Sequence, residues 1–251
     1  MMEGVSPIER TAFVARRVAV SALLAVALTG CGPAGGLGPG SGAATPPSNS
    51  PAAPSTVSAP EAGAAGLEVA VVGDSITAGV APGDDAESPG GQSWLTGADL
   101  PPLELGAGWA VPGASTGEMR DGVRRLDADV LVVMGGTNDL QRDVPWADTR
   151  DNIRAIVSTA SVDRVVLAAI PPLDVLPDEV VVFNDRLREL AELEGWEFVD
   201  PWTDVALEGV YRPGATSDGV HPTQQVAFAV GRELHEALVH GATGGGPETG
   251  R

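Results

Sequence analysis

A serine, a histidine and a carboxylate in this chain have the chemistry needed for nucleophilic acyl transfer. Ser75 lies in the sequence Gly-Asp-Ser-Ile-Thr, directly after an apolar run at residues 67–72, and Asp218 precedes His221 by three residues. A serine hydroxyl is a weak nucleophile until a base takes its proton and an acid orients that base. We therefore expect Ser75 as nucleophile, His221 as base and Asp218 as orienting acid, provided that the fold brings them together.

An acyl-transfer site also needs hydrogen-bond donors for the negative oxygen that develops on the substrate. Three candidates are the side-chain amide of Asn138 and the backbone N–H groups of Gly113 and Ser75. Each motif also has a purely structural interpretation. Serine is a preferred helix cap, and both Asp218-Gly219 and the Gly-Thr-Asn-Asp segment around Asn138 are typical of turns.

The chain contains only three histidines, which narrows the choice of base. His221 lies before a proline, on a predicted loop, and histidine is the side chain that titrates near neutral pH. His235 falls in the last predicted helix and His240 just after it, and we expect both to be solvated.

Predicted strands and helices alternate along the chain, which indicates an α/β fold. The predicted strands are residues 67–72, 102–110, 129–134, 164–170 and 196–199. The predicted helices are residues 115–126, 145–159, 178–194 and 222–239, with a capping box at Ser115 and proline in the first turn at Pro145 and Pro222. Such alternation predicts three α/β/α layers around a mostly parallel, five-stranded sheet. Ligands bind at the carboxyl ends of strands in these sheets, where Ser75, Gly113, Asn138 and His221 would all lie.

These motifs resemble those of the SGNH hydrolases, also called GDSL esterases. The matching blocks, in the family's order, are Gly73-Asp74-Ser75, Gly113, Gly136-Thr137-Asn138-Asp139 and Asp218-Gly219-Val220-His221. The glycine block is the loosest, and Gly106 or Gly108 is an alternative to Gly113. The resemblance implies a flavodoxin-like α/β/α fold and ester hydrolysis through an acyl-enzyme, with no metal and no cofactor.

The N-terminal residues have the layout of a secretory signal. Arginines precede an apolar run at residues 18–28, which is shorter than the roughly 20 residues that span a membrane. The following Leu-Thr-Gly-Cys, ending at Cys31, resembles the bacterial lipobox. That resemblance implies cleavage before Cys31, a lipid on its sulfur, and a protein anchored on the extracytoplasmic face of the cell membrane. The alternative is an ordinary secreted protein, and Arg16-Arg17 leaves the export route open.

Composition divides the chain into four parts. We expect a signal peptide at residues 1–30, a disordered tether at 31–66, one hydrolase domain at 67–240 and a disordered tail at 241–251. The tether is rich in Gly, Pro, Ala and Ser and has too few large apolar side chains to offset the entropy of ordering.

Charge and cysteine content limit the possible partners. The formal net charge is −19 and the chain has no lysine, which argues against a nucleic-acid partner. Cys31 is the single cysteine, so no intrachain disulfide forms. We expect a monomer whose partners are an ester substrate and, through the lipid, a membrane.

Three functions fit these observations. The first is a carboxylic ester hydrolase acting on small acyl groups such as acetyl on a polar or glycan carrier, which the 4% aromatic content favours. The second is a lysophospholipase or thioesterase for longer chains. The third is a catalytically inactive, glycan-binding lipoprotein.

Overall fold

The structure is a computed structural model, and it describes residues 66–79 and 90–244. Its main sheet has five strands in the order β2-β1-β3-β4-β5, all paired in parallel. The strands are β1 (Leu67–Gly73), β2 (Leu103–Ala110), β3 (Val130–Met134), β4 (Arg164–Ala168) and β5 (Glu197–Val199). This is the flavodoxin-like order, so the predicted fold class and all five predicted strands are confirmed.

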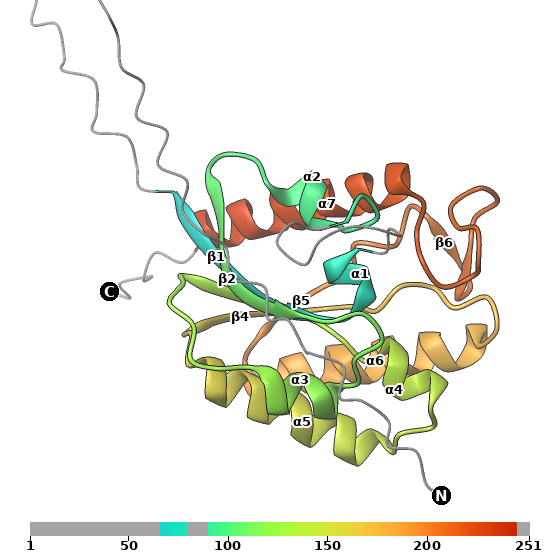
Figure 1. Ribbon diagram of the computed structural model, residues 1–251, viewed down its shortest axis with the longest axis horizontal. Helices are drawn as coiled ribbons and strands as arrows, with labels where there is room; N and C mark the ends of the chain where they lie inside the picture. The colour runs from blue at the N-terminus through green and yellow to red at the C-terminus, as the bar shows by residue number, and fades with distance from the viewer. Residues whose placement is uncertain (1–65, 80–89, 245–251) are drawn as a thin grey trace, which may run out of the picture. The chain divides into compact units, whose positions relative to one another are not determined.

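Helices cover both faces of this sheet (Figure 1). The helices are α1 (Ser75–Ala78), α2 (Leu95–Ala98), α3 (Thr116–Gly122), α4 (Thr137–Gln141), α5 (Trp146–Ala160), α6 (Pro177–Glu194) and α7 (Gln224–Gly244). In Figure 1, α2 and α7 lie above the sheet, and α3, α4, α5 and α6 lie below it. A short antiparallel hairpin of β6 (Ala206–Leu207) and β7 (Val210–Tyr211) follows β5.

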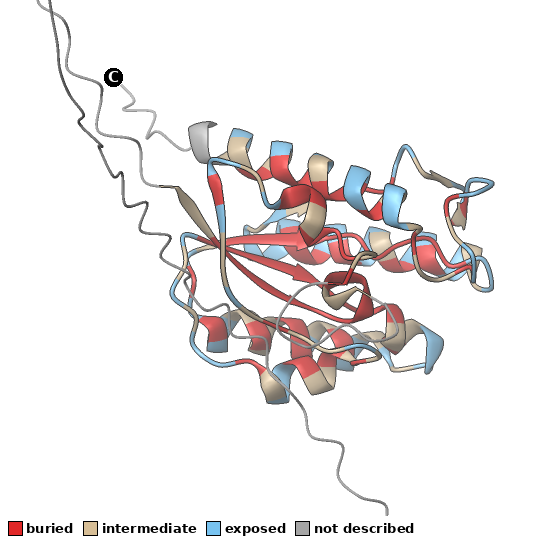
Figure 2. Cartoon of the chain, turned by 45° about the horizontal axis from the view of Figure 1, so that its top comes forward, coloured by how far each residue is buried: buried red, intermediate tan, exposed pale blue. Residues whose placement is uncertain are grey.

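The sheet divides the core into two apolar clusters, because side chains alternate between the faces of a strand. Val69 and Val71 of β1 belong to the cluster that contains Leu234 of α7, whereas Ala70 and Val72 belong to the cluster that contains Ile153 of α5. Figure 2 shows the central strands as mostly buried and the outer surfaces of the helices as exposed, and β3 is buried along its whole length. Full burial of one large aliphatic side chain contributes about 1.5–3 kcal/mol, so both faces stabilise the sheet.

Several predicted boundaries differ from the structure. Helix α7 begins at Gln224, so the prediction that Pro222 occupies its first turn is wrong. Pro222 instead pairs with Thr216 in an isolated β-bridge, which requires an extended backbone. The same helix continues to Gly244, four residues past the predicted domain end at 240, and α3 ends at Gly122 rather than near residue 126.

The shortest elements, which are α1, α2, α4 and the β6–β7 hairpin, were not predicted from the sequence. These helices have only four or five residues, too few to show an apolar period. Tertiary contacts support them. The indole Nε1 of Trp94, the residue before α2, donates to the Thr77 hydroxyl of α1 at 3.0 Å.

The predicted signal peptide, Cys31 and the tether up to residue 65 lie outside the described residues, as does the tail from residue 245. Within the described ranges, no helix is long and apolar enough to cross a membrane.

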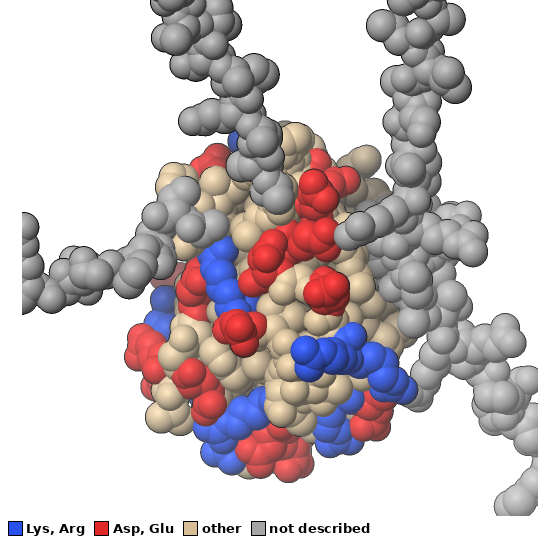
Figure 3. All heavy atoms as spheres, turned by 90° about the vertical axis from the view of Figure 1, so that its left-hand side faces the viewer, with Lys and Arg blue, Asp and Glu red and all other residues tan. Residues whose placement is uncertain are grey.

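Charged side chains of both signs are interspersed on the face of the domain seen in Figure 3. Some of the domain's arginines form close ion pairs, such as Arg164 with Glu197 at 2.7 Å and Arg154 with Glu194 at 2.6 Å. Partly exposed pairs of this kind contribute at most about 1 kcal/mol each, so the charges affect solubility more than folding.

Candidate active site

The chain turns sharply between β1 and α1, and this turn positions Ser75. Asp74 caps the short helix, because its Oδ1 accepts the Ile76 N–H at 3.0 Å. A Cβ at Gly73 would lie 2.1 Å from Thr77 Oγ1 and 2.9 Å from the Met134 carbonyl oxygen. Glycine is therefore required here, and it lets α1 begin directly at the strand end, with Ser75 only 8% exposed.

The structure brings the three expected residues together in one chain of hydrogen bonds. Ser75 Oγ lies 2.9 Å from His221 Nε2, although 146 residues separate them in the sequence. His221 Nδ1 lies 2.7 Å from Asp218 Oδ2. Because a carboxylate only accepts, Nδ1 carries the proton in this arrangement, and Nε2 is free to accept the serine hydroxyl.

Asp218 is held in its ionised form by donors on its own loop. Its Oδ1 accepts the N–H groups of Val220 at 2.9 Å and His221 at 2.8 Å. Burial alone would raise the pKa of Asp218, but the hydrogen bonds from His221 and Val220 outweigh it and lower the pKa to about 2. The carboxylate is therefore charged at neutral pH and stabilises a protonated imidazole.

Two backbone donors are available beside the serine. Among the described residues, the N–H groups of Ser75 and Gly113 donate to no acceptor. The Gly113 carbonyl accepts a hydrogen bond from Arg142 Nη2 at 2.7 Å. Both N–H groups therefore lack a protein acceptor within the described part of the chain, and their role as donors to a negative oxygen stays a prediction.

Asn138 lies on α4 at the same edge, but its amide already has partners. Its Nδ2 donates to the Ala114 carbonyl at 3.0 Å and to Asp74 Oδ2 at 3.3 Å. An amide nitrogen has two hydrogens, so both are engaged. The longer bond to Asp74 is the weaker by geometry, and it is the one that must open before Asn138 can donate to an oxyanion.

The sequence of this domain matches the family model described as the GDSL-like lipase/acylhydrolase family over residues 71–227, which is more than half of the chain. The protein is a member of the GDSL-like lipase/acylhydrolase family. The matched segment includes every residue of the hydrogen-bonded chain from Ser75 to Asp218.

Solved structures of similar fold agree with this assignment. One is a lipase/acylhydrolase from Enterococcus faecalis, with a TM-score of 0.56 and 21% identity, covering 68% of this chain and 95% of that one. Another is a member of the lipolytic G-D-S-L family from Veillonella parvula, with a TM-score of 0.54 and 18% identity, covering 68% and 98%. An acetyl esterase mutant with acetate ion has a TM-score of 0.51 and 14% identity, covering 71% and 99%. At these identities the likeness concerns the fold. No curated protein matches the chain.

In this GDSL-like hydrolase, a second carboxyl, that of Asp74, lies next to the nucleophile, and no role was predicted for it from the sequence. Asp74 is fully buried. Burial raises its pKa to about 6, although the Ile76 N–H and the nearby His221 charge act in the opposite direction. The sequence feature that could have indicated a buried carboxyl is the motif Gly-Asp-Ser directly after a buried strand. A carboxylate at such a strand end is shielded from water.

Asp139, the last residue of the Gly-Thr-Asn-Asp block, has a structural role in this GDSL-like hydrolase. It is fully buried, and its Oδ2 accepts the Thr116 N–H at 2.8 Å. Its Oδ1 accepts the hydroxyls of Thr116 and, at 3.1 Å, Thr149. The side chain therefore joins α4, which carries Asn138, to the first turns of α3 and α5, and so fixes the loop before α3 that carries Gly113.

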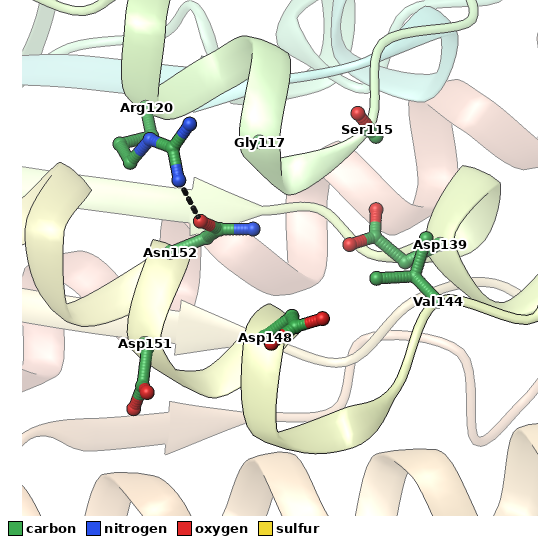
Figure 4. Close-up of a pocket in the computed structure, with 8 residues that line it drawn as sticks. All are labelled: Ser115, Gly117, Arg120, Asp139, Val144, Asp148, Asp151 and Asn152. Carbon is green, nitrogen blue, oxygen red and sulfur yellow. Dashed lines mark hydrogen bonds between the residues drawn. The ribbon is translucent and has the colours of Figure 1, made fainter.

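A polar recess of about 430 Å³ lies beside Asp139, between α3 and α5 (Figure 4). On its left in the figure, Arg120 Nη1 donates to Asn152 Oδ1 at 2.6 Å. The lining residues are Ser115, Gly117, Arg120, Asp139, Val144, Asp148, Asp151 and Asn152. None of them is Ser75, Asp218 or His221, so this recess is separate from the serine site.

The other histidines take no part in the site of this hydrolase. His235 is buried, with Nδ1 3.2 Å from the Ala98 carbonyl oxygen, so its predicted place on a solvated face is wrong. The reason is that α2 packs on this face of α7. In the described part of the chain, no group of three His, Cys, Asp or Glu residues is arranged to hold a metal ion.

Proposed function

We propose that this protein is a serine esterase that hydrolyses carboxylic esters through an acyl-enzyme. The observation that carries the proposal is the unbroken hydrogen-bonded chain Ser75–His221–Asp218, with distances of 2.9 and 2.7 Å. Nucleophile, base and orienting acid need this connection to work as a unit.

In the acylation step, Ser75 Oγ attacks the ester carbonyl carbon, and the hydroxyl proton passes to His221 Nε2. The carbonyl electron pair moves onto oxygen, and the Ser75 and Gly113 N–H groups donate to that oxyanion. The intermediate collapses when the electron pair returns to re-form the carbonyl and the bond to the alcohol oxygen breaks. The alcohol leaves with the proton from His221, and the acyl group stays on Ser75.

In the deacylation step, a water molecule attacks the acyl carbon and gives a proton to His221 Nε2. The second oxyanion uses the same donors. Collapse breaks the bond to Ser75 Oγ, which recovers its proton from His221, and the carboxylic acid is released. Asp218 keeps the imidazole in one tautomer through both steps and stays ionised.

Asn138 is the proposed third oxyanion donor. Its amide hydrogen turns from Asp74 to the substrate oxygen, while the 3.0 Å bond to the Ala114 carbonyl keeps the side chain in place. The substrate oxyanion replaces the Asp74 carboxylate as the acceptor, so the Asn138 amide keeps a hydrogen-bond partner throughout the reaction.

A mutant of the nucleophile tests this proposal. We expect a fluorophosphonate probe to label the wild-type protein at one site and not to label Ser75→Ala. The control variant Ser161→Ala, at the end of α5, should be labelled to the same extent as the wild type. Hydrolysis of a small aryl acetate should follow the same pattern. Full hydrolysis by Ser75→Ala would contradict the mechanism. Absence of labelling in folded wild type would favour a non-catalytic, glycan-binding lipoprotein.

For the substrate, we propose small acyl groups such as acetyl on a polar or glycan carrier. Support comes from the 4% aromatic content and from the many glycine, aspartate and proline residues between positions 80 and 103, a composition poorly suited to an apolar acyl groove. A panel of aryl esters tests this. We expect kcat/KM to be highest for acetyl and to fall with chain length, whereas a preference for decanoyl would indicate a lysophospholipase or thioesterase.

We also propose that the protein is lipid-anchored through Cys31 on the extracytoplasmic face of the cell membrane, and that it is a monomer. The lipobox-like Leu-Thr-Gly-Cys after an apolar run supports the anchor. Cys31→Ser should abolish incorporation of labelled palmitate and release the protein from the membrane fraction. Unchanged labelling of Cys31→Ser would overturn the anchor, and a dimer in size-exclusion chromatography would overturn the monomer.

A further inference from the structure

The acid and the base lie on one short loop that forms its own closed unit. We call residues 215–223 the acid–base loop. At its base, the Thr223 N–H donates to the Ala215 carbonyl at 2.8 Å. Inside it, Thr216 Oγ donates to the His221 carbonyl at 2.6 Å. These bonds set the shape of the loop, but they do not set its position relative to Ser75.

Carbonyl groups of the acid–base loop accept hydrogen bonds from three residues outside it. The donors and acceptors are Asp174 N–H to Gly219 at 3.0 Å, Tyr211 Oη to Val220 at 3.0 Å and Gln92 Nε2 to Pro222 at 2.9 Å. The Val220 carbonyl belongs to the peptide bond that joins Val220 to His221. The Tyr211 hydroxyl, which donates to this carbonyl, therefore restrains the backbone of His221, whose imidazole must contact Ser75.

Tyr211 is itself held firmly. It is buried to 6% exposure, and its ring packs edge-on against Trp202 with 6.4 Å between the ring centres. Its backbone N–H donates to Asp174 Oδ1 at 2.8 Å. Burial raises the pKa of Tyr211 well above its ordinary value, and the nearby Asp218 and Asp174 charges act in the same direction, so the phenol remains a donor.

Asp174 contacts the acid–base loop as well as Tyr211. Gly219 has φ +77°, a region that side chains rarely adopt, and a Cβ there would lie 3.0 Å from Asp174 Cβ. The glycine lets the loop pack directly against Asp174. Tyr211 and Asp174 together therefore hold the middle of the loop against the rest of the domain.

We propose that Tyr211 is a positioning residue for His221. Its hydroxyl fixes the Val220 carbonyl, and so keeps the imidazole within 2.9 Å of Ser75 Oγ. The inference rests on the proposed esterase function, and it assigns to the chain's one tyrosine a role that acts through the base. Small displacements of a catalytic group, on the order of 1 Å, typically cost about 100-fold in rate.

The test compares Tyr211→Phe with the wild type on a small aryl acetate. Phenylalanine keeps the ring and removes only the hydroxyl. We expect kcat to fall by about 10- to 100-fold with KM within about twofold, because substrate binding is unchanged while the base is misplaced. The acidic limb of the pH profile of kcat/KM should also move. Thr203→Val is the control, since it removes a hydroxyl that donates to the Asp200 carbonyl and to no group of the acid–base loop.

A double-mutant cycle separates positioning from a general loss of structure. In a His221→Ala background, adding Tyr211→Phe should change the residual rate by less than about twofold, because the residue that it positions is gone. An equal loss in both backgrounds would overturn the proposal. So would an unchanged kcat and pH profile for Tyr211→Phe.

Two further measurements keep the outcomes distinct. If Tyr211→Phe fails to fold, as judged by thermal unfolding, Asp174→Ala replaces it. That variant removes the acceptor of the Tyr211 N–H and should lower kcat in the same direction, and an unchanged kcat would contradict the proposal. Failure of the esterase function looks different, because the wild type itself would then neither hydrolyse the ester nor react with fluorophosphonate.

Discussion

Asn138 Nδ2 lies 3.3 Å from Asp74 Oδ2, which links the proposed oxyanion donor to the residue that caps the nucleophile's helix. The two residues are 64 positions apart and come from the ends of β3 and β1, which are neighbours in the sheet. Asp74 is fully buried, and this burial raises its pKa to about 6. A substrate oxyanion must therefore compete with this carboxylate for the Asn138 amide, and the charge of Asp74 affects both the stability and the chemistry of the site.

Replacement of Asp74 by Asn should change the pH dependence of stability. Burial raises the pKa of Asp74 from 3.8 to about 6, so the folded protein binds this proton more tightly than the unfolded chain does. The stability linked to this proton is present below pH 3.8 and is lost as the pH rises to about 6. Asn keeps the cap and does not titrate. Relative to wild type, the variant should gain about 2 kcal/mol of unfolding free energy between pH 4 and pH 7.

Urea denaturation of both proteins at pH 4, 5, 6 and 7 measures this difference. A difference in unfolding free energy that does not depend on pH would show that Asp74 titrates normally in the folded state.

Truncation of Asn138 should affect the chemical step more than substrate binding. Asn138→Ala removes one proposed oxyanion donor, and loss of one such donor typically lowers kcat by about 100- to 1,000-fold. KM should stay within about threefold, since the oxyanion exists only during the reaction. Steady-state kinetics on an aryl acetate provide the measurement. Gln141→Ala, on the exposed side of the same helix, should keep the wild-type kcat.

Asp218→Asn should lower kcat by about 10,000-fold, because the amide does not hold the imidazole in the required tautomer. The exposed Asp204→Asn, on a loop outside the site, is the control with wild-type activity. A loss of less than about tenfold in Asp218→Asn would show that the orienting acid lies elsewhere.

The stability of Asp218→Asn should depend on pH with the opposite sign to that of Asp74→Asn. The folded pKa of Asp218 is lowered to about 2, through hydrogen bonds from His221 and Val220 that outweigh burial. The stability that this carboxylate contributes is present above pH 3.8 and is lost as the pH falls through about 2. The penalty of Asp218→Asn, measured by denaturation at pH 2 and pH 5, should therefore be larger at pH 5.

Gly73→Ala should destabilise the fold, because the new methyl group would lie 2.1 Å from Thr77 Oγ1 and 2.9 Å from a β3 carbonyl oxygen. Overpacking of this kind costs about 1–3 kcal/mol, measured as a lower midpoint of urea unfolding. Gly117→Ala, in helix α3, is the matched control. Its nearest neighbour would be 3.6 Å away, and alanine favours the helix, so stability should rise by about 0.5–1 kcal/mol. Equal effects at both positions would contradict the close approach of α1 to the sheet.

The predicted elements with a clear apolar pattern are present in the structure. Residues 130–134 are five consecutive buried apolar side chains, and such a run predicts a central parallel strand without further information. The capping box at Ser115 is also formed, because its two hydrogen bonds depend on residues only three positions apart. Elements of four or five residues, such as α1 and α4, were not predicted, because tertiary packing rather than a local sequence pattern stabilises them.

Residue types and order in the sequence already determined the five-stranded α/β fold, the family resemblance and the three candidates Ser75, Asp218 and His221. These features depend on local apolar patterns and on short motifs, which can be read position by position. Only the tertiary structure decided that Ser75 Oγ lies 2.9 Å from His221, that Asp74 takes a hydrogen of Asn138, and that Tyr211 anchors the acid–base loop. The physical reason is that each of these contacts joins different elements at the carboxyl edge of the sheet, and strand order and loop packing set their distances.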